Sequence, residues 1–81
     1  MKKVRLGSVM HVSKSSGNLI LRVEAKARIG DNVFNKQGKM VGRVFDLFGP
    51  VEKPYASVKP SQDPERLVGK PLYVNPPRKG K

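Results

Sequence analysis

The chain has 81 residues, which is enough for one small domain but leaves little room for a deep catalytic pocket. Cysteine is absent, which excludes disulfides, thiolate metal ligands and a thiol nucleophile. The 17 lysines and arginines outnumber 6 acidic residues, and a net charge of +11 is typical of proteins that work beside nucleic acid. No apolar run reaches the ~18 residues of a membrane span and no signal-peptide pattern is present, so we expect a soluble intracellular protein without membrane contact.

The first third of the chain predicts a β-hairpin. Apolar residues recur at alternate positions across residues 4–12, which indicates a half-buried strand. Residues 13–17 are rich in serine and glycine and predict a turn. A second strand is predicted over residues 18–25, with apolar side chains on one face and Arg22 and Glu24 on the other.

The middle of the chain predicts two further strands separated by tight turns. Turns are predicted at residues 29–32 and 35–38, on either side of a short strand at 33–34. The longest predicted strand covers residues 39–48 and is apolar on both faces near its end. Gly42 in its middle indicates a coil, a bulge or a close backbone approach, which helps a small sheet to close.

The last third predicts a strand at residues 55–59 and another at 72–74. Residues 61–67 are the one helical candidate, a single turn that Ser61 would cap. Residues 76–81 form a basic tail of proline, glycine and charged residues with nothing to bury.

These elements predict an all-β fold. Six short strands with tight turns indicate a small antiparallel barrel, closed or split, over residues 1–75. Closure is a physical need at this size because an open sheet of six strands would leave its edges exposed.

A stiff apolar loop joins the longest strand to the next. Phe48, Val51 and Tyr55 are large, while Pro50 and Pro54 fix φ and remove two backbone donors. Such a loop loses little entropy on docking, which suits protein binding better than catalysis. Phe48 and Tyr55 can instead turn inward as a corner of the core, but the loop has more apolar residues than a small barrel needs.

The strand before this loop extends the candidate surface. If Met40, Val44 and Phe48 face inward, then Val41 or Phe45 must face outward beside Arg43. Apolar side chains ringed by arginine are typical of interfaces. An equal alternative is that Val41 and Phe45 belong to the barrel core and that Arg43 is simply solvated. The predicted protein interface comprises Val41, Arg43, Phe45, Phe48, Gly49, Pro50, Val51, Pro54 and Tyr55.

No residue set predicts catalysis, a metal site or a cofactor. Asp46 has no basic partner at a fixed spacing, so we expect it to stabilise a turn or form an ion pair. His11 is the one histidine and does not make a metal site with scattered carboxylates. Gly38-Lys39 and Gly69-Lys70 lack the rest of a phosphate-binding loop. We therefore expect the chain not to be an enzyme.

Five basic residues in the two tails are candidates for contact with RNA. Steering to RNA would follow from salt-dependent phosphate contacts, whereas solubility is the simpler role because tails give no specificity. These residues are Lys2, Lys3, Arg78, Lys79 and Lys81.

An ordered set of short motifs identifies a family resemblance. The set contains Val41-Gly42-Arg43-Val44, Asp46, Phe48-Gly49-Pro50-Val51 and Pro54-Tyr55, with Leu6-Gly7 near the start. It resembles the GAR-type protein of H/ACA guide-RNA ribonucleoproteins, over roughly residues 5–74. The Gly/Arg-rich flanks of eukaryotic relatives are missing, so the chain is similar to an archaeal form.

The resemblance implies a six-stranded barrel of the translation-factor kind without an active site, cofactor or metal of its own. Its implied partner is a dyskerin-type pseudouridine synthase, in a complex that uses guide RNA to select uridines in ribosomal RNA. The barrel would touch the guide RNA only indirectly and act on a mobile loop of the synthase, assisting substrate loading and release. An archaeal protein of this kind would be cytoplasmic, and a eukaryotic relative nucleolar.

Two other functions remain in competition with a non-catalytic subunit. A direct RNA-binding barrel, such as an OB-like module or a small ribosomal protein, predicts steeply salt-dependent RNA binding. Three Phe, two Tyr and no Trp give few stacking platforms, and they do not alternate visibly with basic residues. An enzyme ranks last. The exposed apolar face also predicts weak self-association of the isolated chain.

Overall fold

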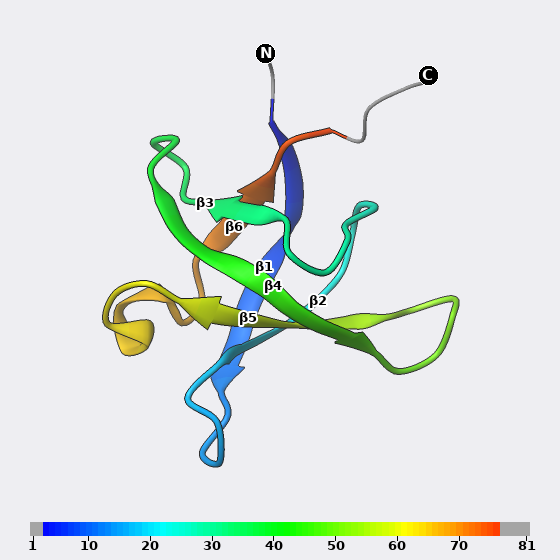
Figure 1. Cartoon of the computed structure of the whole chain (residues 1–81), viewed down its shortest axis with the longest axis horizontal. Helices are drawn as coiled ribbons and strands as arrows, with labels where there is room; N and C mark the ends of the chain where they lie inside the picture. Colours follow the sequence, from blue (N-terminus) through cyan, green and yellow to red (C-terminus); the bar gives the residue numbers. More distant parts are fainter. Residues whose placement is uncertain (1–2, 77–81) are drawn as a thin grey trace.

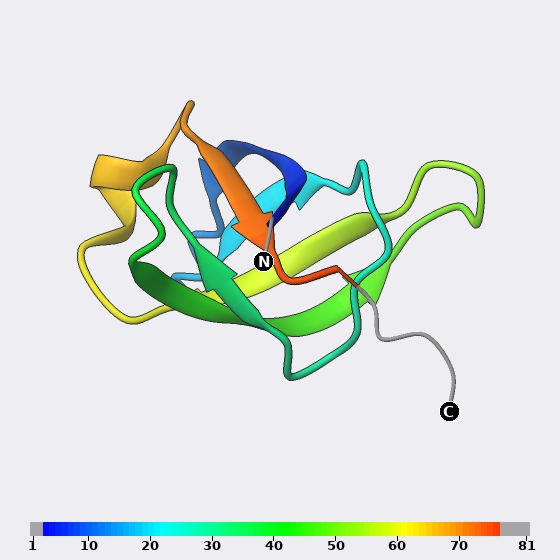
Figure 2. The same ribbon diagram turned by 90° about the horizontal axis from the view of Figure 1, so that it is seen from above.

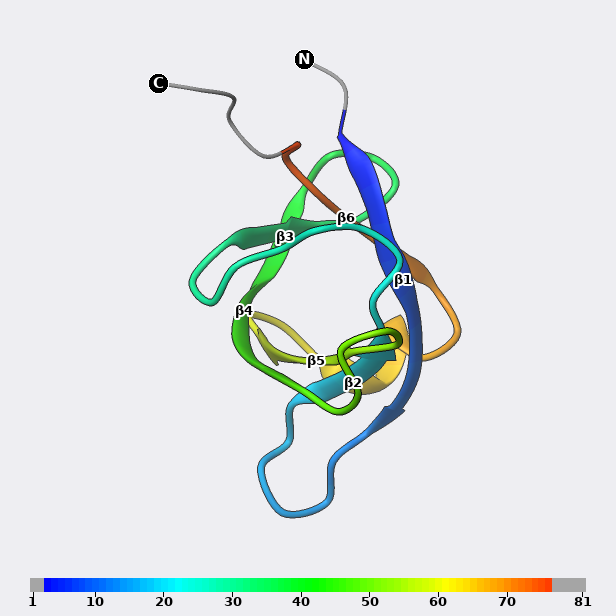
Figure 3. The same ribbon diagram turned by 90° about the vertical axis from the view of Figure 1, so that its right-hand side faces the viewer.

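Six antiparallel strands close into a barrel in the order β1-β2-β5-β4-β3-β6 (Figures 1 and 3). The computed structural model describes residues 3–76. Its elements are β1 (Val4–Val12), β2 (Leu19–Arg22), β3 (Asn32–Phe34), β4 (Met40–Phe48), β5 (Tyr55–Pro60), the 3-10 helix η1 (Pro64–Leu67) and β6 (Pro71–Val74). The predicted all-β barrel is confirmed. Within the described residues, no helix has the length and apolarity needed to cross a membrane.

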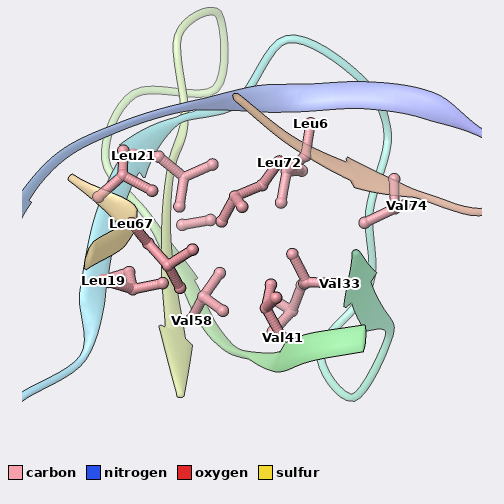
Figure 4. Close-up of a cluster of buried hydrophobic side chains, with 12 residues drawn as sticks. Leu6, Leu19, Leu21, Val33, Val41, Val58, Leu67, Leu72 and Val74 are labelled. Atoms are coloured by element: carbon pink, nitrogen blue, oxygen red, sulfur yellow. The ribbon is translucent and has the colours of Figure 1, made fainter. Parts of the chain in front are cut away.

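The barrel interior is filled by aliphatic side chains, most of them labelled in Figure 4. Alternate residues along β2 and β6 are buried, as the period of a strand requires, whereas register shifts interrupt the alternation along β1 and β4. The 3-10 helix adds Leu67 from one end, so the core is closed there by a side chain from outside the sheet. The buried apolar residues are Leu6, Val9, Leu19, Leu21, Val33, Val41, Val44, Ala56, Val58, Leu67, Leu72 and Val74.

Two predicted elements differ from the structure by several residues at one end. Strand β2 ends at Arg22 because the chain then leaves the sheet and crosses the end of the barrel. There the Val23 amide donates to the Pro54 carbonyl over 2.9 Å. The helical turn is capped by Asp63 and not by Ser61, since the Asp63 side chain accepts a hydrogen bond from the Glu65 amide over 3.2 Å.

Strand β4 bends around the barrel through two irregularities in its pairing. Its register shifts once against β3, between Val33 and Phe34, and once against β5, between Val44 and Asp46. Gly42 lies between these points, where a Cβ atom would collide with the Lys59 carbonyl oxygen. The predicted close backbone approach at Gly42 is therefore confirmed, and β4 can curve tightly against β5.

The first irregularity reverses the predicted orientation of Val41. Val33 pairs with Gly42 and Phe34 with Met40, which leaves Val41 as the extra residue opposite β3. Val41 turns into the core and is 0 % exposed, so its assignment to a protein interface is wrong. Met40 is exposed, so the inward face assumed for it is wrong, and Phe48, a predicted interface residue, is exposed as well. A bulge adds one residue to a strand and shifts the inside–outside alternation beyond it.

Candidate functional site

An aromatic stack stands at the base of the β4–β5 loop, which comprises residues 49–54. Phe48 and Tyr55 are cross-strand partners whose ring centroids lie 5.8 Å apart, with 18° between the ring planes. The Arg22 guanidinium lies over the Tyr55 ring at 6.0 Å from its centroid. Phe48 is 44 % exposed and Tyr55 is half-buried. The alternative of a core corner is therefore wrong for Phe48.

The tip of the β4–β5 loop projects away from the barrel (Figures 1 and 2). Val51 at this tip is 96 % exposed, and Pro50 is exposed beside it. The Lys53 amide donates to the Pro50 carbonyl over 3.2 Å, and the Pro54 carbonyl accepts from the Val23 amide. The loop is thus braced at its tip and at its base while it presents apolar side chains to solvent.

Gly49 is required at the start of this loop for two reasons. Its φ is +93°, a left-handed conformation that other residues adopt at a cost. A Cβ atom at this position would also lie 2.9 Å from the Tyr55 Cδ1 atom. A side chain at residue 49 would therefore displace the Tyr55 ring from its stack on Phe48.

A Gly49→Ala substitution is expected to weaken both the fold and the candidate surface. Gly38 supplies the matched control, because its φ is +89° and a Cβ atom added there would have no neighbour within 4 Å. Gly38→Ala is expected to cost about 1 kcal/mol through φ alone. Gly49→Ala is expected to cost about 1 kcal/mol more and to alter the near-ultraviolet circular dichroism of Tyr55. Equal urea midpoints and equal spectra for the two variants would contradict this.

The outer face of β4 continues the surface from the loop along the sheet. Phe45 is 60 % exposed and lies at the second irregularity of the strand. Arg43 is also exposed and pairs across the sheet with Lys59 on β5. Asp46 stabilises the irregularity, since its Oδ1 accepts a hydrogen bond from the Leu47 amide over 2.9 Å. Asp46 lies within β4 and not in a turn, so this local role differs from the turn-stabilising one expected for it.

A broad hollow of about 1070 Å³ lies beside the β4–β5 loop and was not predicted from the sequence. The β2–β3 segment forms one wall, and Asn75 and Pro76 line the hollow after β6. This wall is fixed because the Gly30 amide binds the Val44 carbonyl and the Val44 amide binds the Asp31 carbonyl. Its floor is largely half-buried and aliphatic, with Val23, Ala25, Ala27, Leu47 and Pro54. The candidate surface therefore combines a convex part, the projecting β4–β5 loop, with a concave part, the hollow beside it.

Eight of the nine predicted interface residues therefore lie along one continuous stretch of β4, the loop and β5, and Val41 lies in the core. The same face places aromatic and basic side chains together, which the sequence pattern did not reveal. The signal was missed because Arg22 comes from β2, which pairs with β5 and is remote in sequence. Within residues 3–76 no group of side chains is suited to hold a metal ion.

Comparison with known protein families shows to which family the chain belongs. A family model described as the Gar1/Naf1 RNA binding region matches residues 4–79. The chain belongs to the Gar1/Naf1 family. This confirms the resemblance to the GAR-type protein and supports an RNA-binding, non-catalytic role associated with H/ACA ribonucleoproteins.

Two archaeal proteins are similar to this Gar1/Naf1 chain. An uncharacterized protein of Methanothermobacter thermautotrophicus is 43 % identical over 74 residues, covering 85 % of this chain and 79 % of the relative. An uncharacterized protein of Methanocaldococcus jannaschii is 46 % identical over 44 residues, covering 54 % of this chain and 53 % of the relative. Both relatives agree with an archaeal form of the Gar1/Naf1 family.

The tail cations of this Gar1/Naf1 chain are only partly described. Lys3 lies with its Nζ atom 4.5 Å from the centroid of the Phe34 ring, a cation–π contact that fixes it against β3. Lys2, Arg78, Lys79 and Lys81 lie outside the described residues. Their predicted contact with RNA stays a prediction.

Proposed function

We propose that the chain is a non-catalytic subunit of an H/ACA ribonucleoprotein that binds a dyskerin-type pseudouridine synthase. The contact surface is the β4–β5 loop with the Phe48–Tyr55 stack and the outer face of β4. The observation that carries the proposal is the exposure of Val51, at 96 %, on a loop whose backbone is hydrogen-bonded at its tip and at its base.

Three physical features suit this surface to a protein partner. An exposed apolar patch on a small domain indicates a binding site, because burying it gains free energy. Pro50, Pro54 and the two backbone hydrogen bonds of the loop restrict its conformations, which reduces the entropy lost on docking. Arg22 and Arg43 supply the polar rim around an aromatic centre, a composition enriched in the energetically dominant parts of interfaces.

The hollow beside the loop gives the partner a place to insert a segment. Its aliphatic floor and the charged rim of Glu24, Lys26 and Arg28 fit an amphipathic stretch of polypeptide. In the proposed complex this stretch is the mobile loop of the synthase, and holding it assists substrate loading and release. An archaeal chain with this role would work in the cytoplasm.

The test is RNA-guided modification with purified synthase, guide RNA and a ribosomal RNA fragment. We expect the chain to form a complex with the synthase in size-exclusion chromatography without RNA. We also expect it to raise the multiple-turnover rate of pseudouridine formation more than the single-turnover rate, because release affects only the former. Failure to form the complex at moderate salt would overturn the proposal.

A second candidate is a barrel that binds RNA directly through the same face. It is favoured by the adjacency of Phe48, Tyr55 and Arg22, since stacked aromatics beside arginine are suited to single-stranded bases. This candidate predicts that a Phe45→Asp variant loses RNA binding and that the isolated chain ignores the synthase. An electrophoretic mobility shift across a salt series, run beside the chromatography, separates the two functions.

A further inference from the structure

A small groove of about 310 Å³ lies between the β3–β4 turn and the segment from η1 to β6. The segments that line it lie at the opposite end of the molecule from the β4–β5 loop, as Figures 1 and 2 both show. None of the residues that line the groove belongs to the β4–β5 loop or to β4, so the two surfaces do not overlap. The groove is lined by Asn35, Lys36, Gln37, Arg66, Leu67, Lys70 and Pro71.

All the charged side chains that line this groove are positive. Lys36, Arg66 and Lys70 line it, and no acidic side chain is among its lining residues. The nearest carboxylates in the sequence are Asp63 and Glu65 on η1, and the Asp63 carboxylate accepts the Glu65 amide as a helix cap. Within residues 3–76 the one salt bridge is Arg5–Glu24, so the structure shows no carboxylate paired with the three groove cations.

The backbone that carries these cations is held rigidly. In the β3–β4 turn the Asn35 side chain accepts from the Lys39 amide over 2.9 Å, and the Asn35 carbonyl accepts from the Gly38 amide over 2.9 Å. On the other wall, the Lys70 carbonyl accepts from the Val9 amide over 3.0 Å, and the Gly69 amide donates to the Val9 carbonyl over 2.8 Å.

Arg66 is positioned by its neighbour in η1. Leu67 is anchored in the barrel core at 5 % exposure, which fixes the helical turn and leaves Arg66 exposed at the groove. Three cations from two segments far apart in the sequence therefore line one groove on a fixed scaffold. Like charges repel, so a fold that collects them without paired acids is stabilised by an anion that binds among them.

We propose that this groove binds the phosphodiester backbone of RNA. Arg66 can bind a phosphate through two parallel N–H donors, and the two lysines supply point charges on either wall. The Asn35 and Gln37 amides at the rim can donate to phosphate or exchange hydrogen bonds with a ribose 2′-hydroxyl. The proposal goes beyond the proposed function, because the protein-binding surface lies at the other end and both ligands fit at once.

The test measures binding of a short fluorescein-labelled oligouridylate to the full chain by fluorescence anisotropy. A K36Q/R66Q/K70Q variant is expected to bind about tenfold or more weakly at low salt. The slope of log K against log salt should fall by about 2, since each phosphate contact with a single strand contributes about 0.7. The matched control is R5Q/K14Q/K59Q, which removes the same number and type of charges from exposed sites outside both proposed surfaces.

The control variant is expected to lose less than about threefold in affinity with little change in slope. Equal losses in the two variants would show that the overall charge attracts RNA and would overturn the groove. If the K36Q/R66Q/K70Q variant bound the oligouridylate with the affinity of the unmodified chain, the proposed phosphate site would be overturned as well. Synthase binding without RNA, measured on the same folded variant, reports on the proposed function separately, because it does not involve this end of the barrel.

Discussion

Replacing Val41 with aspartate is expected to unfold the barrel, whereas Phe45→Asp on the same strand leaves it folded. Val41 is fully buried among aliphatic side chains, and an unpaired carboxylate there costs several kcal/mol. The whole domain is expected to be stable by only about 4–12 kcal/mol, at ~0.05–0.15 kcal/mol per residue. Phe45 is exposed, so its substitution should change stability by about 1 kcal/mol or less.

The measurement is thermal unfolding by far-ultraviolet circular dichroism, with dispersion of the amide NMR spectrum as a second readout. Val41→Ala serves as an intermediate step. It removes apolar contacts without adding charge and is expected to lower stability by about 2 kcal/mol while the chain remains folded. A folded Val41→Asp variant with an unchanged melting temperature and lost synthase binding would instead support the outward orientation expected from the sequence.

The positions of the strands were predictable because the signals for them are local. The first strand was predicted with its observed bounds, Val4–Val12, and the bounds of β4 and β6 differed by one residue at one end. The alternation of apolar residues that marks a strand, and the glycines and prolines that mark its ends, are both patterns of only a few residues. Closure of the barrel followed from size alone, since few residues can protect the edges of an open sheet.

The orientation of side chains along β4 was not predictable in the same way. It depends on the bulge at Val41, which exists because β3 and β4 must pair while both curve around the core. The pairing of β3 with β6, and of β2 with β5, brings together segments far apart in the sequence. Alternation within one strand carries no information about such partners, so the extra residue at each of the two irregularities changed the expected faces.

In the candidate site, too, the features set by local sequence were predictable and those set by distant segments were not. The β4–β5 loop was predicted because prolines, a glycine and exposed apolar residues occur in one short run. The hollow beside it and the groove at the opposite end were not predicted. Their walls come from several segments each, and no local pattern marks Lys36, Arg66 and Lys70 as neighbours.

Replacing Val51 with glutamate is expected to weaken synthase binding by about 30-fold or more without changing the stability of the chain. At 96 % exposure the valine makes almost no contact within the barrel, so the free protein has little to lose. In the proposed complex the same position is covered, and a carboxylate there would be desolvated without a partner. Truncating a central interface residue costs about 2 kcal/mol or more, which corresponds to roughly 30-fold in Kd.

The matched control is Val68→Glu, the same change of side chain at another exposed valine. Val68 is the C-cap residue of η1, at the end of the barrel remote from the β4–β5 loop, and is 43 % exposed. Isothermal titration of each purified variant against the synthase, without RNA, should show the loss for Val51→Glu alone. Equal binding by both variants would mean that no partner covers the loop. The exposed apolar tip would then have to be explained by the RNA-binding alternative, in which the Phe48–Tyr55 stack and Arg22 contact bases.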